Sequence, residues 1–105
     1  MIYTVEEIKR RVAPVADKYH LAAVYLFGSY ARKEATENSD VDLMVDRSGS
    51  TIRGMFDMGA LYEDLRQSVG KEIDLITTQT LEQAHTQERS SRFIHSIEHE
   101  RIRLI

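Results

Sequence analysis

The sequence contains no cysteine and a single proline among its 105 residues. The absence of cysteine excludes disulfides, thiolate nucleophiles and cysteine-based zinc sites. No apolar run approaches the roughly 18 residues that cross a membrane, and the first residues have neither the basic nor the apolar segment of a signal peptide. We therefore expect a cytoplasmic protein with no membrane partner.

An excess of positive charge is also missing. The 14 lysines and arginines are outnumbered by 17 aspartates and glutamates, which gives a formal net charge of −3 at pH 7. Direct nucleic-acid binding is therefore not expected, because no polycation is available to neutralise phosphates. The content of 42% hydrophobic and 30% charged residues is typical of an ordered globular protein. We expect one domain over residues 1–105, so that any second subsite must come from a partner chain.

The hydrophobic pattern predicts helices alternating with strands. Thr4 and Glu7 have the spacing of a capping box, and the apolar period that follows predicts a helix ending near His20. A helix is also predicted over 51–69, with an apolar stripe that comprises Ile52, Met55, Phe56, Gly59, Tyr62, Leu65 and Val69. The remaining pattern predicts strands over 22–27, 40–46 and 71–77, a short helix over 29–35, one or two helices over 80–99, and a short strand or frayed tail over 101–105. This order is typical of an α/β layer fold.

Three aspartates carry the candidate chemistry. Asp40 and Asp42 are two positions apart on a predicted strand, so both project from one face with their Cα atoms about 6.6 Å apart. Carboxylate oxygens of this kind suit Mg²⁺, which proteins hold with one or two carboxylates and the phosphates of a substrate. Asp74 lies in another predicted strand among apolar residues. If the two strands are neighbours, three carboxylates can hold two metal ions roughly 3.5–4 Å apart, an arrangement suited to in-line phosphoryl transfer.

A second set of residues suits phosphate. Gly28 ends a buried strand and lets the backbone approach a ligand, and Ser29 begins a short helix whose free N–H groups favour an anion. Arg32, one turn later, could add a charge-assisted contact to the same phosphates. Each feature alone is weak evidence, because a Gly-Ser turn after a strand and an edge strand with solvated acids are both common.

Taken together, these motifs resemble the nucleotidyltransferase superfamily of the DNA polymerase beta type. The segments that carry the resemblance are Gly28-Ser29-Tyr30-Ala31-Arg32, then Ser39-Asp40-Val41-Asp42-Leu43, then Asp74. The sequence is most similar to the minimal nucleotidyltransferases (MNT), the antitoxin half of HEPN/MNT toxin–antitoxin pairs, over essentially the whole chain. The resemblance implies the nucleotidyltransferase fold, an α/β (α+β) structure with a small mixed sheet of three to four strands flanked by helices.

The resemblance also implies roles for the acids. Asp40 and Asp42 match the metal-binding pair of the superfamily. Asp74 matches its third acid, which ligates the second Mg²⁺ and activates the acceptor hydroxyl as general base. No member of this triad is missing from the sequence.

The nucleotide-binding residues are implied in the same way. Gly28 and Ser29 match the phosphate-binding turn, Arg32 matches a residue that contacts the triphosphate, and Ser39 is assigned to the same nucleotide site. The sequence departs from the family pattern at Lys33, where glycine is common. This departure puts the local loop geometry in question rather than the metal site.

The activity implied by the resemblance is a Mg²⁺-dependent transfer of AMP from ATP to a hydroxyl, with release of pyrophosphate. The implied acceptor is a tyrosine of the cognate HEPN toxin, an RNase that this AMPylation silences. Two alternatives stay open at this point: an antitoxin that acts by binding alone, and the nucleotide-binding subunit of a two-chain small-molecule transferase of the aminoglycoside type.

Other polar and aromatic residues are assigned to structural roles. Asp46 is interpreted as a solvated cap at the far end of its strand. We expect surface positions rather than a metal site for His95 and His99, and a solvated basic face for Arg89, Arg92, Arg101 and Arg103. Core or half-buried positions are expected for Tyr25, Tyr30 and Tyr62, of which Tyr30 could also line the nucleotide pocket.

Overall fold

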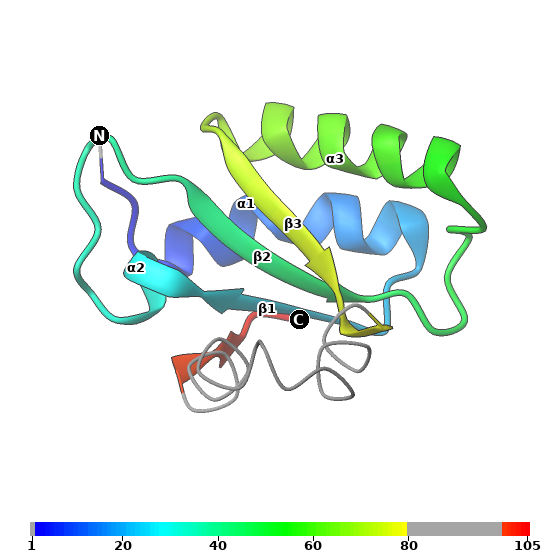
Figure 1. Cartoon of the computed structure of the whole chain (residues 1–105), viewed down its shortest axis with the longest axis horizontal. Helices are drawn as coiled ribbons and strands as arrows, with labels where there is room; N and C mark the ends of the chain where they lie inside the picture. The colour runs from blue at the N-terminus through cyan, green and yellow to red at the C-terminus, as the bar shows by residue number, and fades with distance from the viewer. Residues whose placement is uncertain (1, 80–99) are drawn as a thin grey trace, which may run out of the picture.

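The computed structural model describes residues 2–79 and 100–105 of the chain (Figure 1). Its elements are, in chain order, α1 (Val5–Tyr19), β1 (Ala23–Phe27), α2 (Gly28–Ala31), β2 (Val41–Asp46), α3 (Met55–Val69), β3 (Ile73–Thr77) and β4 (Ile102–Arg103). This order confirms the predicted α/β fold. The helices predicted over 80–99 lie outside the described residues, together with Arg89, Arg92, His95 and His99.

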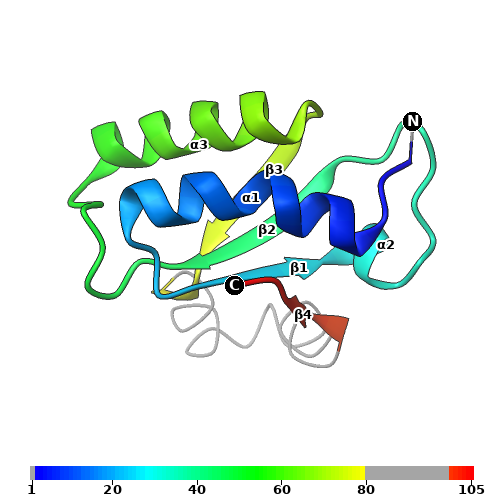
Figure 2. The same cartoon turned by 180° about the vertical axis from the view of Figure 1, so that it is seen from behind.

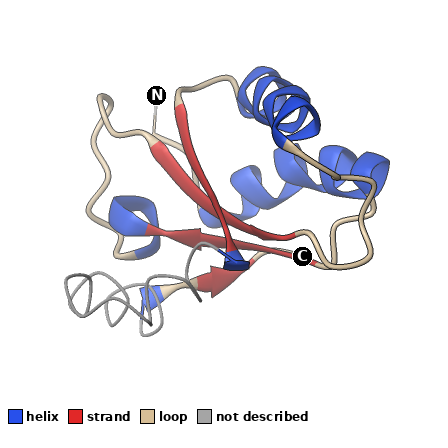
Figure 3. Cartoon of the chain, turned by 45° about the vertical axis from the view of Figure 1, so that its right-hand side comes forward, coloured by secondary structure: helices blue, strands red, loops and turns tan. Residues whose placement is uncertain are grey.

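Four strands form one mixed sheet, in the order β3-β2-β1-β4. Strand β1 runs antiparallel to both β2 and β4, whereas β2 and β3 are parallel. The last strand pairs Ile102 with Leu26 and Arg103 with Tyr25, so the end of the chain forms a strand rather than a frayed tail. Figure 3 shows the strands in red with the two long helices on one side of them.

The hydrophobic core lies between this sheet and the two long helices. In the view of Figure 2, α1 lies across the strands of the sheet, and α3 lies alongside α1. In β2, Val41, Leu43 and Val45 have no exposed surface, and they pack with residues of α1 and α3 in one cluster. The opposite face of the same strand carries Asp42 and Met44, as the alternation along the sequence predicts. The helices therefore cover one face, and the carboxylate projects from the other.

The first helix begins and ends where the sequence predicts. The Oγ1 atom of Thr4 accepts a hydrogen bond from the Glu7 backbone N–H at 3.1 Å, which caps the start of α1. His20 closes the other end in the left-handed conformation. The buried side of the helix consists of Ile8, Val12, Val15 and Ala16. No helix in the described part of the chain is both long enough and apolar enough to span a membrane.

The third helix begins later than predicted, at Met55. Ile52 is buried ahead of the helix, whereas Met55 and Phe56 are each 92% exposed. These two residues therefore do not belong to the buried stripe, contrary to the prediction. The stripe is set by Leu61 and Leu65, and about 100° of rotation per residue turns the first two helical residues away from it.

The second helix is also shorter than the predicted span, because it ends after a single turn at Ala31. Lys33 has a φ of 62°, in the left-handed region that stops a helix. Its N–H donates to the Tyr30 carbonyl at 3.3 Å, and the Glu34 N–H donates to the Ser29 carbonyl at 2.8 Å. Lysine thus stands at a position whose backbone conformation favours glycine, the residue that the resemblance to the nucleotidyltransferases implies here.

Replacing Lys33 with glycine is expected to stabilise the protein by about 1 kcal/mol. A residue with a Cβ in the left-handed region costs roughly 1–2 kcal/mol, and the larger backbone entropy of glycine in the unfolded chain offsets part of this gain. Urea unfolding curves would measure the change. His20→Gly is a matched comparison, because His20 has a φ of 55° at the far end of α1. A loss of stability in Lys33→Gly alone would show that the Lys33 side chain stabilises the fold.

Candidate active site

The parallel pairing of β2 with β3 brings two of the predicted acids together. In this register Asp42 lies directly opposite Asp74, so both side chains leave the same face of the sheet. Asp40 lies just before β2, two residues upstream of Asp42. Asp40 and Asp74 are exposed and Asp42 is half-buried. The hypothesis that Asp40, Asp42 and Asp74 act together requires the strands of Asp42 and Asp74 to be neighbours. The structure shows that they are.

The electrostatics of Asp42 reflect this crowding of acids. Burial, followed by the negative charges of Asp74 and Asp40, raises the pKa of the Asp42 carboxyl to about 6. Arg32 opposes the shift in pKa, so its guanidinium lies near enough to affect the same carboxylate. A cation placed among these acids would relieve both the repulsion and the poor solvation of the Asp42 carboxylate.

This set of carboxylates fits a cation of the Mg²⁺ type. Within residues 2–79 and 100–105, no group of three His, Asp or Glu side chains is placed to hold a metal ion by itself. Mg²⁺ does not require three protein ligands, because it is usually bound through one or two carboxylates together with substrate phosphates and water. The facing carboxylates of Asp42 and Asp74, with Asp40 two residues upstream of Asp42, meet that requirement.

Gly28 makes the close packing around Asp42 possible. It has a φ of 72°, and a Cβ atom at this position would lie 2.0 Å from Oδ2 of Asp42. A side chain therefore cannot be accommodated unless the carboxylate moves. Ser29 follows in α2 and is half-buried. The structure thus brings the predicted phosphate-binding turn directly against the predicted metal-binding acid.

Arg32 lies at the edge of this cluster and is paired with other acids. Its Nε donates to Glu34 Oε2 and its Nη1 to Glu100 Oε2, each at 3.1 Å. These two hydrogen bonds raise the pKa of the guanidinium above its ordinary value. A phosphate that binds Arg32 would have to compete with two carboxylates.

The hydroxyl of Ser39 shapes the turn that leads into Asp40. Its Oγ accepts a hydrogen bond from the Thr36 backbone N–H at 2.8 Å, and the Ser39 N–H donates to the Thr36 carbonyl at 3.0 Å. The structure therefore places Ser39 beside the acids, with its hydroxyl directed into the turn.

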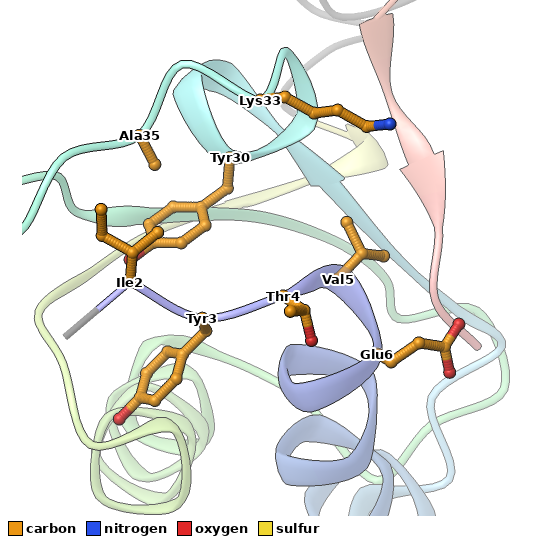
Figure 4. A pocket seen from close by; sticks show the side chains of 8 residues that line it. All are labelled: Ile2, Tyr3, Thr4, Val5, Glu6, Tyr30, Lys33 and Ala35. Atoms are coloured by element: carbon orange, nitrogen blue, oxygen red, sulfur yellow. The ribbon is translucent and has the colours of Figure 1, made fainter.

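Tyr30 lies in the core, as expected from the interpretation of Tyr30 as a core aromatic residue rather than a residue of the nucleotide pocket. Its side chain is 4% exposed and belongs to the cluster beneath the long helices. With Ile2 and Val5 among others, it lines a cavity of about 390 Å³ between the N-terminal segment and α2. Figure 4 shows the side chains that line this cavity. In the described part of the chain the Tyr30 hydroxyl has no hydrogen-bond partner. Asp42, by contrast, projects from the other face of the sheet.

The residues assigned to structural roles behave accordingly where they are described. Asp46 Oδ1 accepts a hydrogen bond from the Ser48 N–H at 2.9 Å, which caps the far end of β2. The Arg101 guanidinium lies 4.8 Å from the centre of the Tyr25 ring, and Arg103 Nε donates to the Ile105 carbonyl at 2.8 Å. No motif in the sequence points to Lys71, whose ammonium bonds the Glu37 carbonyl in the turn before Asp40.

Comparison with known proteins shows the family to which the chain belongs. The family described as "Polymerase beta, Nucleotidyltransferase" matches residues 10–100. The chain belongs to this family and is accordingly a nucleotidyltransferase, which confirms the predicted enzyme class and fold.

Its relatives include proteins with a more specific name. "Protein adenylyltransferase MntA" of Thermococcus cleftensis is 32% identical over 82 residues, which cover 74% of this chain and 81% of the relative. "Putative protein adenylyltransferase MJ0435" of Methanocaldococcus jannaschii is 36% identical over 73 residues, which cover 70% of this chain and 76% of the relative.

Solved structures share the fold. A crystal structure described as "the toxin-antitoxin with AMP-PNP" superposes with a TM-score of 0.66 at 19% identity, over 92% of this chain and 72% of the other. A mutant of the toxin-antitoxin MntA-HpeT superposes with a TM-score of 0.63 at 18% identity, over 92% of this chain and 71% of the other. At this level of identity the likeness concerns the fold alone.

Proposed function

We propose that the protein transfers AMP from ATP to a hydroxyl of a partner protein, as the antitoxin of a toxin–antitoxin pair. The observation that carries the proposal is the pairing of Asp42 with Asp74 on adjacent parallel strands, with Gly28 packed against the Asp42 carboxylate. The relatives named protein adenylyltransferase support the choice of AMP and of a protein acceptor. The toxin–antitoxin structures with the same fold are consistent with a toxin as the partner.

In this proposal the acids bind two Mg²⁺ ions and the preceding turn binds the nucleotide. Asp40 and Asp42 hold the metal, and Asp74 contributes to the second ion. When bound, the ions supply positive charge that screens the triphosphate and stabilises the charge of the reacting phosphate. The ATP phosphates lie against the phosphate-binding residues Gly28, Ser29, Arg32 and Ser39.

The chain's own residues account for the remaining steps. The acceptor hydroxyl oxygen forms a bond to the α-phosphorus while the bond from that phosphorus to pyrophosphate breaks. Asp74 takes the hydroxyl proton as general base. Its carboxylate is exposed, which allows a hydroxyl on a separate molecule to reach it.

We further propose that the acceptor is a tyrosine of a HEPN RNase toxin and that the reaction takes place in the cytoplasm, where ATP is available. The exposed carboxylate of Asp74 is consistent with an acceptor that is presented by another protein. Silencing then follows from a covalent AMP on the toxin.

The test is to incubate the protein with α-labelled ATP, Mg²⁺ and the product of the adjacent open reading frame. We expect label on the partner protein, on a tyrosine identified by mass spectrometry, and no label when EDTA removes the metal. Label found only on small molecules would support the small-molecule transferase instead. Full neutralisation of the toxin by Asp42→Asn would support an antitoxin that acts by binding alone.

A further inference from the structure

Lys71 contacts the segments that carry the candidate active-site residues. It lies between Gly70, which caps the end of α3, and the start of β3. Its Nζ donates a hydrogen bond to the Glu37 carbonyl at 2.9 Å. The same ammonium lies 5.9 Å from the centre of the Tyr30 ring, within the range of a cation–π interaction.

Each of these contacts reaches a segment of chain that carries a candidate site residue. Glu37 belongs to the turn that leads into Asp40, and Tyr30 belongs to α2, which begins at Gly28. Lys71 itself precedes Asp74 on the same stretch of chain. The Lys71 ammonium therefore connects three segments of the chain. These are its own segment before β3, the turn before β2, and the short helix α2.

The backbone pairing of β2 with β3 begins beside this group. The Val41 N–H donates to the Glu72 carbonyl at 3.0 Å. Strand pairing fixes Asp42 relative to Asp74, but Asp40 lies before β2, in the segment that follows the turn. The hydrogen bond from Lys71 ties that turn to the start of β3.

We infer that Lys71 is a positioning residue that sets the distance between Asp40 and the facing pair of acids, and thereby the affinity for the cation. The inference rests on the proposed assignment of these acids to metal binding. A long, flexible stem with three donors suits this role, because it can bond a carbonyl and approach an aromatic ring at the same time.

The test compares Lys71→Met with Lys71→Arg. Methionine keeps the stem and removes the charge and the donor, and arginine restores both. Lys18→Met is a matched control, because the Lys18 ammonium bonds Asp64 at 2.9 Å between α1 and α3, away from the acids. Direct titration calorimetry of Mn²⁺, with a non-cleavable ATP analogue present and no acceptor, reports metal affinity independently of transfer.

We expect Lys71→Met to weaken Mn²⁺ binding about tenfold, within the range for residues that support metal ligands. The Mg²⁺ concentration for half-maximal transfer should rise equally, and KM for ATP should change less than twofold. Lys71→Arg should recover most of the affinity, and Lys18→Met should match the wild type.

Two results would overturn the inference. An increase in KM for ATP with unchanged metal affinity would make Lys71 a phosphate-binding residue. Equal losses in Lys71→Met and Lys71→Arg, with a matching fall in Tm, would indicate a contribution to stability alone. If the wild type binds Mn²⁺ but transfers no AMP, the proposed function fails, while the calorimetric comparison still decides the role of Lys71.

Discussion

Asp42→Asn is expected to abolish nucleotide transfer and, at the same time, to make the metal-free protein more stable. The activity falls because the amide no longer offers a charged ligand to the cation. The loss should exceed the roughly 100-fold that follows removal of a residue that only supports a metal ligand. The stability rises because the amide carries no charge to be desolvated or repelled by Asp74 and Asp40.

The size of the stability gain follows from the pKa. A rise from 3.8 to about 6 for Asp42 would correspond to roughly 3 kcal/mol in a fully shielded group. Because this carboxyl is half-exposed, solvent screening reduces the expected gain in stability to about 1 kcal/mol. For a chain of this size, that raises Tm by about 4–8 °C. Asp46→Asn, on the same strand but at its far end, should retain transfer activity.

The same carboxyl gives the metal-free protein a pH dependence of known sign. Its raised pKa means that the folded chain binds the proton more tightly than the unfolded chain does. The contribution of Asp42 to the free energy of unfolding should therefore fall as the pH rises from about 4 to about 6, and stay low above that range. Urea unfolding in EDTA at several pH values would measure it. The prediction is wrong if Asp42→Asn is less stable than the wild type near pH 7.5.

Gly28→Ala is expected to have the second largest effect, on both activity and stability. The new methyl group would overlap Oδ2 of Asp42, which lies 2.0 Å from its position, so the carboxylate has to leave its place. We expect transfer to fall at least about 100-fold, since a small misplacement of a reacting group costs that much. The left-handed backbone adds a penalty of roughly 1–2 kcal/mol.

Gly49 provides the control for that backbone penalty. Its φ of 70° is close to the 72° of Gly28, but in the described part of the chain no atom beyond its two neighbours in sequence lies within 4 Å of the position of its Cβ. Gly49→Ala should therefore lose similar stability from strain and keep its activity. Steady-state transfer assays and urea unfolding of the two variants separate the effects. Equal activities in the two variants would contradict the role given to Gly28.

The parts of the site that depend on local sequence could be predicted. The alternation around Asp42 places it on one face of a strand, and the glycine that stops β1 marks a turn, because both signals are contained in a few neighbouring residues. From the sequence, a place for Asp74 in the acidic site could be predicted only on the condition that its strand lies next to that of Asp42. Its register against Asp42 depends on pairing between distant segments, which periodicity does not encode.

The errors arose where tertiary packing overrides the local pattern. Met55 and Phe56 fit a helical apolar stripe by composition, yet the rotation of α3 is set by the leucines that face the sheet, and both residues are exposed. The link between Lys71 and the Glu37 carbonyl joins residues far apart in the chain. No spacing rule covers such a contact.

The parallel pairing of β2 with β3 also bears on protein synthesis. Parallel strands cannot be joined by a tight hairpin, and here the connection between them is α3. On the ribosome Asp42 emerges well before Asp74, so the nascent chain exposes an unpaired half of the acidic cluster until β3 has left the exit tunnel. Because pairing of distant segments is slow to form, the facing acids assemble only after most of the chain has been translated.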